Sequence, residues 1–308
     1  MNILVTGGAG FIGANMAQRH VSDGHRVVVV DDLSAGRREK VPPGARFVQA
    51  DLAETDVEPL LREERIEFVS HHAAQIDLRH SVADPLHDAR ANILGSLRLF
   101  EACRRAGTRR ILFASTGGAL YGEPEGGRPA PETHPTNPVS PYGCAKLSIE
   151  KYLYYYQVIH GLETQVLRYA NVYGPGQSGS GEAGVVAIFA EAILRGKRPS
   201  IRGDGGQTRD YVFVGDLVEA AARAIERPGS GTWNVGTGRE TSVNELYRLV
   251  AAALDYNEEP DYVPLPPGEQ RRSVLDGTRL LADFGLPGYT PLQSGIPVTA
   301  EFFRETVR

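Results

Sequence analysis

A glycine-rich turn directly after the first apolar segment constrains the fold of this chain most. Residues 2–5 are predicted to form a buried strand, and Gly7, Gly10 and Gly13 follow at three-residue intervals. In such a turn the first glycine permits a tight bend and the second lets the backbone approach a pyrophosphate at a helix N-terminus. The third allows the helix to pack closely on the strand. The pattern therefore predicts a strand, a phosphate-binding turn and a helix running towards Asp23.

A second apolar segment supports the dinucleotide interpretation. Residues 26–30 are predicted to form a strand that ends in Asp31. This offset of about 20 residues is the one expected for a carboxylate that accepts a hydrogen bond from the adenosine ribose. A carboxylate repels a 2′-phosphate, so NAD is predicted rather than NADP. Arg37 and Arg38 weaken this preference slightly, and we interpret them as solvated loop charges.

The alternation of elements predicts an α/β fold. Short apolar runs are separated by longer helical stretches, which is typical of a Rossmann-type, doubly wound parallel sheet. The further strands are expected at 47–50, 68–69, 111–114, 164–169 and 232–235, with long helices at 85–106 and 140–160.

The rhythm of elements breaks after Asn171. A glycine-rich stretch covers 174–184, a helix is expected at 185–194, and Ser242 with Glu245 forms a capping box. We therefore expect a smaller, discontinuous C-terminal substrate lobe. The predicted dinucleotide-binding domain comprises 1–171 plus 205–256, and the predicted lobe comprises 172–204 plus 257–308.

Composition argues against several classes of partner. The net charge of −5 and the absence of a basic run give no reason to expect nucleic acid. No apolar run reaches the roughly 18 residues of a membrane span, and the N-terminus does not resemble a secretory signal. Cys103 and Cys144 lack metal-ligand spacing, and we expect no metal site at them or at His71 and His72. A cytoplasmic location without membrane association is predicted.

Tyr142 and Lys146 are the candidate catalytic pair. Residues four apart are neighbours on a helix face, so a phenol and an ammonium are brought together. A phenol has a pKa of roughly 10, and a base near pH 7 needs that pKa lowered by about 3. A cation beside the phenol, joined by an oxidised nicotinamide, provides the physical route.

The assembled motifs resemble the extended short-chain dehydrogenase/reductase family and, within it, the UDP-glucose 4-epimerase group. The matching residues are Gly7–Gly13, Asp31–Ser34, Asp51–Leu52, His72–Gln75, Asn92, Ala119–Gly122, Ser140–Lys146, Arg168–Pro175 and Arg209–Tyr211. The resemblance implies that Tyr142 takes the proton of a sugar 4-hydroxyl while C4 passes hydride to NAD. The 4-keto sugar then turns over and is reduced on its other face, which inverts C4 of a UDP-hexose. Lys146 would also hold the nicotinamide ribose, and NAD would stay bound through the cycle.

The resemblance also implies a set of binding residues. The cofactor set is Gly7, Gly10, Phe11, Ile12, Gly13, Asp31, Asp32, Leu33, Ser34, Gly36, Asp51, Leu52, His72, Ala73, Ala74, Gln75, Asn92, Ser115, Tyr142, Lys146 and Tyr169. The substrate set is Thr116, Gly117, Tyr142, Asn171, Val185, Arg202, Arg209, Glu269, Arg271 and Ser273.

The chain departs from the family pattern beside the reacting hydroxyl. A serine or threonine is expected three residues before the apolar-Tyr-Gly end of the strand, and Gly117 stands there. We expect Thr116 to supply the hydroxyl instead. A 4,6-dehydratase would have Asp-Glu immediately after that position, whereas Gly118 and Ala119 follow it here, so elimination of water is not expected.

Two further departures concern the UDP-sugar. Pro266 replaces a second diphosphate-binding arginine, and Arg271 or Arg272 could substitute for it, with Arg202 near the uracil. Ser273 stands at the position that resembles a size gate beside the C2 substituent. A small residue there predicts room for an N-acetyl group, so the N-acetylated pair of UDP-hexoses is a further expectation.

Several alternatives remain at the level of sequence. A UDP-glucuronate 4-epimerase would need a cation near C6 that the sequence does not place. A non-catalytic protein that binds NAD or a nucleotide sugar, or an oxidoreductase with net redox change, would share the same motifs. In this family the two long helices often pair with their copies, and the run Tyr154–Tyr156 suits a homodimer.

Overall fold

A parallel sheet of seven strands forms the centre of the computed structural model, which describes residues 1–123, 127–179, 184–265 and 270–307. The order of its strands is β11-β6-β5-β4-β1-β2-β3. The strands are β1 (Asn2–Thr6), β2 (Arg26–Asp31), β3 (Arg46–Gln49), β4 (Phe68–His71), β5 (Arg110–Thr116), β6 (Glu163–Tyr169) and β11 (Gly231–Val235). The order of strands reverses between β1 and β4, where the loops at the carboxyl ends diverge and ligands bind in sheets of this kind. The Rossmann-type fold predicted from the sequence is confirmed.

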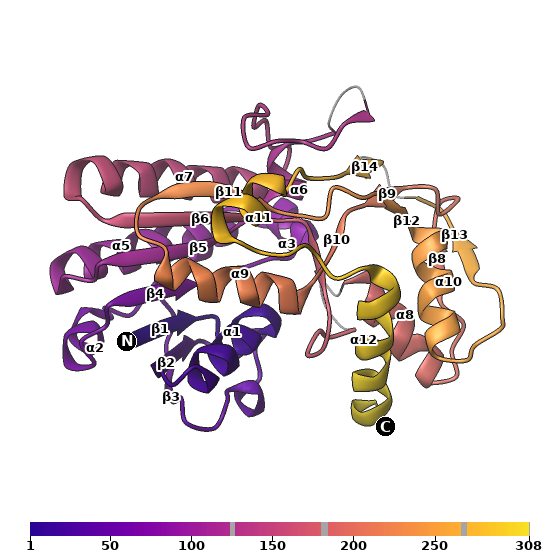
Figure 1. Cartoon of the computed structure of the whole chain (residues 1–308), viewed down its shortest axis with the longest axis horizontal. Helices are drawn as coiled ribbons and strands as arrows, with labels where there is room; N and C mark the ends of the chain where they lie inside the picture. Colours follow the sequence, from indigo (N-terminus) through magenta and orange to yellow (C-terminus); the bar gives the residue numbers. More distant parts are fainter. Residues whose placement is uncertain (124–126, 180–183, 266–269, 308) are drawn as a thin grey trace.

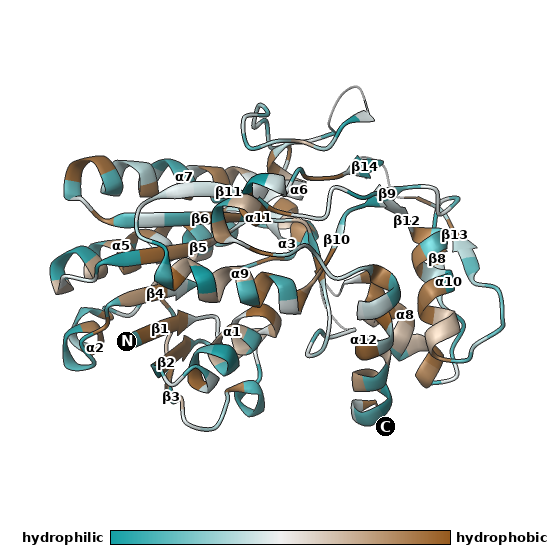
Figure 2. Cartoon of the chain, in the orientation of Figure 1, coloured by the Kyte–Doolittle hydropathy of each residue, from teal (hydrophilic) through white to brown (hydrophobic). Residues whose placement is uncertain are grey.

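Helices cover both faces of this sheet (Figure 1). One apolar cluster joins the sheet to α1 (Phe11–Ser22), α9 (Val214–Glu226) and α11 (Thr278–Phe284). A second cluster joins the opposite face to α2 (Glu58–Glu63), α5 (Gly95–Ala106) and α7 (Pro141–His160). Figure 2 shows apolar colour along central strands such as β1, and mixed polar and apolar residues along α5 and α9. The apolar stripes of the helices therefore face the sheet, as an amphipathic helix requires.

The segment predicted as one helix over 85–106 consists of three helical pieces. α4 (Pro85–Ala89) passes into a π-helical turn, η2 (Arg90–Leu94), before α5 begins. α3 (Leu78–Ala83) precedes them, and the one-turn helix α6 (Gly117–Leu120) follows β5. π-turns of this kind occur often at functional sites.

A second packing unit lies beside the sheet, on the right of Figure 1. α8 (Val185–Leu194), α10 (Val243–Ala253) and α12 (Leu292–Thr306) share one apolar cluster, in which the rings of Phe189 and Tyr247 meet edge to face at 5.5 Å. Short strands complete the unit: β7 (Asn171–Tyr173) pairs with β10 (Tyr211–Phe213), and β8 (Ser200–Arg202) pairs with β13 (Asp261–Val263). β9 (Thr208–Arg209) lies between β12 (Thr241–Ser242) and β14 (Arg272–Ser273).

The packing favours a different division of the chain from the boundaries predicted above, which stay a prediction. α10 shares its apolar cluster with α8 and α12, so it groups with the smaller lobe and not with the sheet. α11 groups with the sheet, because the ring of its Phe284 packs edge to face on Trp233 of β11 at 5.1 Å. The N-cap of α10 is as expected, since Ser242 Oγ accepts a hydrogen bond from Glu245 N at 3.1 Å.

Across the part of the chain that the structure describes, none of the helices combines the length and apolar character that a membrane crossing would require.

Gly13 provides a test of the close contact between α1 and the turn after β1. A Cβ at this position would lie 2.7 Å from the carbonyl carbon of Gly7 and 2.9 Å from Gly8 Cα, which are backbone atoms that cannot rotate away. We expect Gly13→Ala to lower the free energy of unfolding by about 1–3 kcal/mol in urea denaturation, because overpacking forces the backbone apart.

Gly95→Ala is the matched control for this change. A Cβ on Gly95, also helical, would meet its nearest atom at an ordinary 3.5 Å, so alanine should stabilise α5 by up to about 1 kcal/mol. Equal unfolding free energies for Gly13→Ala and the wild type would contradict the proposed close packing.

Candidate active site

The turn after β1 forms a cradle for a pyrophosphate. Gly7 adopts a φ of +67°, and a Cβ there would lie 2.6 Å from Ala73 N in the loop after β4. The loops after the two strands therefore touch at the point where the strand order reverses. Gly10 is the N-cap of α1 and has no side chain, so the first backbone N–H groups of the helix remain available to an anion.

The carboxylate of Asp31 is held in place at the end of β2. Its Oδ2 accepts a hydrogen bond from Ala9 N at 3.0 Å, and its Oδ1 accepts one from Leu33 N at 2.9 Å. A Cβ on Gly36 would come within 2.8 Å of Oδ1, so only glycine leaves that approach open. Asp31 is oriented by these two amides, while Asp32 is turned towards the amide and hydroxyl of Ser34. This arrangement fits a ribose diol and disfavours a 2′-phosphate.

The end of β3 offers the next two predicted cofactor residues. Asp51 Oδ1 accepts a hydrogen bond from Ala53 N at 2.7 Å, and its carboxylate stays partly exposed. Leu52 is buried in the apolar cluster beneath it. The structure therefore presents a polar edge over an apolar floor, as an adenine requires.

The residues after β4 are tied to β1 through Thr6. Thr6 Oγ1 accepts hydrogen bonds from His72 N and Ala73 N, each at 3.2 Å, and contacts His71 Nδ1 at 2.7 Å. Burial lowers the pKa of His72 to about 3, so its imidazole is neutral. Within the described residues no group of three His, Cys, Asp or Glu side chains could hold a metal ion.

Tyr142 and Lys146 lie together on the first turns of α7. Ser140 caps this helix by accepting a hydrogen bond from Gly143 N at 3.1 Å. Lys146 is buried, its Nζ donates to the carbonyl of Ala114 at 2.9 Å, and Nζ lies 5.7 Å from the centroid of the Tyr142 ring. The neighbouring placement predicted from the four-residue spacing is confirmed.

Burial is the largest influence on the pKa values of both members of the pair. Burial lowers the pKa of Lys146 to about 8, although the negative charges of Asp88 and Glu150 oppose the effect. Burial and the charge of Asp88 raise the pKa of the Tyr142 phenol above its usual range. Lys146 alone therefore does not turn the phenol into a base. The positive charge of an oxidised nicotinamide would act on the phenol in the same direction as Lys146 when bound.

An apolar neighbour explains why residue 117 is a glycine and not the serine or threonine of the family pattern. A Cβ on Gly117 would lie 2.6 Å from Leu275 Cδ2, so Leu275 fills the space that a serine side chain at 117 would need. Thr116 ends β5, and its Oγ1 accepts a hydrogen bond from Ala119 N at 3.3 Å. That contact leaves the hydroxyl proton of Thr116 available for donation.

A buried polar network that the sequence did not predict lies behind this strand. Glu150, one turn after Lys146 on α7, accepts hydrogen bonds from Ser115 Oγ at 2.6 Å and from Arg168 Nε at 3.0 Å. Arg168 Nη1 donates to Tyr121 OH at 2.6 Å, and Tyr121 OH donates to Asn234 Oδ1 at 2.8 Å. The hydroxyl of Ser115, predicted to contact the cofactor, is thus directed into the protein. The signals in the sequence were Arg168 within a predicted strand and Glu150 four residues after Lys146, on the same face of the predicted helix.

The predicted substrate residues come from separate elements. Arg209 donates to the carbonyls of Gln270 and Thr208 at 2.7 and 2.9 Å, so its guanidinium is held where β9 meets the segment before β14. Ser273 is buried in β14, and its Oγ lies 3.4 Å from the position of a Cβ on Gly118. The structure thereby brings Ser273 next to the turn that carries Gly117.

The remaining predicted residues are more scattered. Asn171 begins β7 beside Tyr211, Val185 begins α8, and Arg202 ends β8. The backbone of Arg271 donates to Glu123. Glu269 and Pro266 lie outside the described residues.

Tyr169 has a buried hydroxyl that could form a hydrogen bond to a ligand. It ends β6, and its hydroxyl has no hydrogen-bond partner among the described residues. Together with the glycine cradle and the oriented carboxylate of Asp31, this atom fits a bound dinucleotide.

The fold and this constellation define a dinucleotide-dependent protein of the short-chain dehydrogenase/reductase type. The model of the NAD dependent epimerase/dehydratase family matches residues 3–236, and the chain belongs to that family. It is 46% identical to a UDP-glucose 4-epimerase of Mycolicibacterium smegmatis over 310 residues, which cover 99% of each chain.

Solved structures give the same assignment. The UDP-glucose 4-epimerase of Thermotoga maritima with UDP-glucose shares 45% identity and a TM-score of 0.97. The UDP-glucose 4-epimerase of Thermus thermophilus in complex with NAD shares 45% identity and a TM-score of 0.94. Each match covers 100% of both chains. The expected family and its use of NAD are confirmed.

The ion pair of Glu150 and Arg168 gives a stability prediction. Both side chains are less than a tenth exposed, so Glu150→Gln leaves a buried guanidinium without its charge partner. We expect the free energy of unfolding to fall by about 3–5 kcal/mol in urea denaturation.

Glu301→Gln is the control for this substitution. Glu301 pairs with Arg304 on the exposed face of α12, where removal of the charge should cost at most about 1 kcal/mol. If both variants unfolded at the same urea concentration, the buried pair would not have the structural importance assigned to it.

Proposed function

We propose that this chain is an NAD-dependent 4-epimerase that interconverts UDP-glucose and UDP-galactose through a 4-keto intermediate. The observation that carries the proposal is the pair formed by the partly buried Tyr142 and the buried Lys146, which lies at the end of β5 beside the dinucleotide crevice. The full-length similarity to UDP-glucose 4-epimerases supports the choice of substrate.

The residues of the chain divide the chemistry between them. Bound NAD supplies a hydride acceptor that later returns the hydride. Tyr142 takes the proton of the C4 hydroxyl as the C4–H bond breaks, and it gives that proton back after the sugar has presented its other face. Lys146 keeps a positive charge beside the phenol, and Thr116 provides a hydrogen-bond donor near the C4 oxygen. Because the hydride and the proton both return, the net change is inversion at C4.

The binding roles expected from the sequence remain part of this proposal. The contacts of Gly7, Gly10, Gly13 and Asp31 support their place in the cofactor site. Among the substrate residues, Ser273 is supported by its position against Gly118, where a larger side chain would narrow the space. Room for an N-acetyl group at C2 follows from this small residue.

Tyr142→Phe tests the proposed reaction. The substitution removes the proton acceptor and keeps the ring, so kcat for UDP-glucose should fall by about 10²- to 10⁴-fold while bound NAD is retained. The measurement is separation of the C4 epimers after incubation without added NAD. Tyr154→Phe, an exposed tyrosine on the same helix, is the control and should keep full turnover.

The same assay distinguishes the alternatives. Turnover of UDP-N-acetylglucosamine would support the role of Ser273, and turnover of UDP-glucuronate alone would replace the proposed substrate. Stoichiometric accumulation of NADH would indicate an oxidoreductase with net redox change. A wild-type protein that retains NAD and leaves every UDP-sugar unchanged would overturn the proposal in favour of a binding protein.

We further propose a homodimer formed through the face of α4, α5 and α7. Exposed apolar side chains lie on α4, on the turn η2 that leads into α5, and on α7: Leu86, Leu94, Tyr154, Val158 and Ile159. Such a concentration of exposed apolar residues is typical of an interaction surface. A cytoplasmic location remains the prediction from the sequence.

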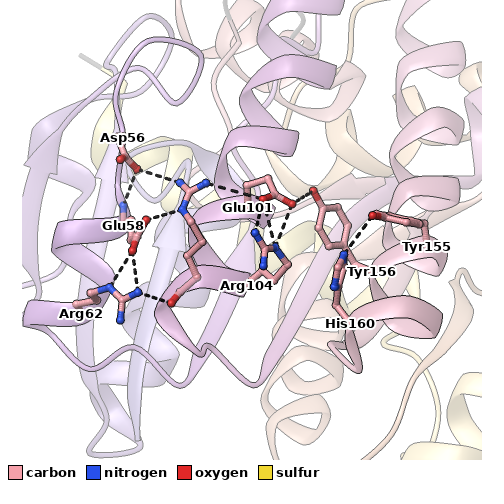
Figure 3. Close-up of polar contacts among 9 residues, drawn as sticks. Asp56, Glu58, Arg62, Glu101, Arg104, Tyr155, Tyr156 and His160 are labelled. Carbon is pink, nitrogen blue, oxygen red and sulfur yellow. Dashed lines mark hydrogen bonds and ion pairs between the residues drawn. The ribbon is translucent and has the colours of Figure 1, made fainter.

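A polar frame holds the two long helices of this face together (Figure 3). Tyr156 OH of α7 donates to Glu101 Oε1 of α5 at 2.8 Å, and Arg104 binds the same carboxylate at 2.9 Å. Tyr155 OH contacts His160 Nε2 at 3.1 Å at the end of α7. The first of these contacts ties α7 to α5, and the other two lie within a single helix.

Val158→Asp tests the dimer. A charge in an apolar interface loses its hydration, so we expect the mass measured by light scattering after gel filtration to fall to that of one chain. Val298→Asp is the control, because Val298 is about equally exposed on α12 in the other lobe. A single-chain mass for the wild type, or an unchanged dimer mass for Val158→Asp, would contradict the proposed face.

A further inference from the structure

A buried carboxylate that the proposed mechanism does not yet use lies on α4, beside the helix that carries the catalytic pair. Asp88 belongs to α4, which packs on α7, and it is 1% exposed. Its Oδ1 accepts hydrogen bonds from Gln75 Nε2 at 3.1 Å and from Asn92 Nδ2 at 3.0 Å. Burial raises the pKa of the Asp88 carboxyl, and the hydrogen bonds from Gln75 and Asn92 oppose this effect because they stabilise the charged form.

The two amides bound by Asp88 also bind each other. Gln75 N donates to Asn92 Oδ1 at 2.9 Å, and Asn92 Nδ2 donates to the carbonyl of Gln75 at 2.9 Å. Gln75 lies in the loop after β4 that touches the glycine turn, and Asn92 lies in the π-helical turn η2. Asp88 therefore fastens the loop beside the cofactor crevice to the helices behind it.

Asp88 also acts on the catalytic pair through its charge. It raises the pKa of Tyr142, which opposes the phenolate, and it raises the pKa of Lys146, which favours the ammonium. The other titratable groups around Lys146 are Glu150, with a charge of the same sign as that of Asp88, and the neutral imidazoles of His71 and His72. His87 faces Asp88 from α4 itself.

We propose that Asp88 is a positioning residue that holds the Gln75–Asn92 clamp and sets a negative charge against the ammonium of Lys146 beside Tyr142, so that the phenol can both take and return a proton. This inference rests on the proposed function. Lys146 is charged in both half-reactions, whereas a nicotinamide is cationic only when it is oxidised. An ammonium without a counter-charge would favour the phenolate, so the return of the proton to the sugar would slow. General acid and base catalysis by one group works best when its proton affinity matches the operating pH.

Asp88→Asn tests the charge in the holoenzyme. Asparagine keeps an Oδ1 acceptor for both amides, and it replaces the other carboxylate oxygen with a neutral NH2 group, so the negative charge is lost. The phenolate of Tyr142 then forms more readily, so the acid limb of the pH profile of kcat should move to lower pH by about one unit. Loss of the same charge lowers the pKa of Lys146, so the alkaline limb should also move to lower pH.

A spectroscopic titration reports the same change without turnover. Ultraviolet absorbance measures phenolate formation, and subtraction of the Asp88→Asn, Tyr142→Phe double variant isolates Tyr142 from the other tyrosines. Asp84→Asn is the matched control, because Asp84 is an exposed N-cap of the same helix and asparagine keeps the cap. Its profile and titration should equal those of the wild type. Asp88→Ser removes the same charge and serves as the second variant if Asp88→Asn folds poorly. It should reproduce the shift in the Tyr142 titration and in the pH profile.

Retention of NAD tests the clamp separately from the charge. Asp88→Ala removes the acceptor as well as the charge, and we expect it to lose bound NAD during gel filtration while Asp88→Asn retains it. Wild-type titration and pH limbs in both Asp88→Asn and Asp88→Ser would overturn the charge role, and full NAD retention in Asp88→Ala would overturn the clamp. A titration shift in a protein whose wild type converts no UDP-sugar would support Asp88 and overturn the proposed function instead, so the two failures are distinguishable.

Discussion

The structure of this site depends on an ammonium group that is buried at the end of a parallel strand. Lys146 donates to the carbonyl of Ala114, and neither of the nearby carboxylates, Asp88 and Glu150, forms an ion pair with it in the described part of the chain. A buried ammonium is costly unless negative charge compensates it. The surrounding elements therefore carry acidic groups that act on Lys146 without binding it, which keeps its Nζ hydrogens available for the ribose it is proposed to hold.

The two carboxylates act on the same ammonium from different helices, and each is held in place by different hydrogen-bond partners. Glu150 is committed to Arg168 and Ser115, so it locks α7 to β5 and β6. Asp88 is committed to two amides, so it locks the loop after β4. Local partners fix the position of each carboxylate. Each carboxylate therefore keeps a constant distance from Lys146 and raises its pKa.

The sequence was informative where a property depends on neighbours along the chain. The spacing of Gly7, Gly10 and Gly13 and the helical offset of Tyr142 and Lys146 are local, so their geometry followed from elementary rules. The network of Asp88 joins residues from a loop and two helical turns, and nothing in the spacing reveals which side chains meet. The packing of α10 against α8 is a long-range property of the same kind, because the apolar stripe of an amphipathic helix does not identify the element that it packs against.

The exchange of serine for Gly117 is also a property of packing between distant segments. Leu275 occupies the space beside Gly117, and its backbone N–H donates to the buried carboxylate of Asp210 at 3.2 Å. The same carboxylate accepts hydrogen bonds from Thr237 N at 3.0 Å, so Asp210 holds the segment of Leu275 against the end of β11. A serine at 117 would require the end of the Leu275 side chain to move, because its Cδ and Cγ atoms occupy the space, whereas the braced backbone lies further away. The glycine is therefore matched to the leucine side chain, and Thr116 stays the proposed hydroxyl donor to the C4 oxygen.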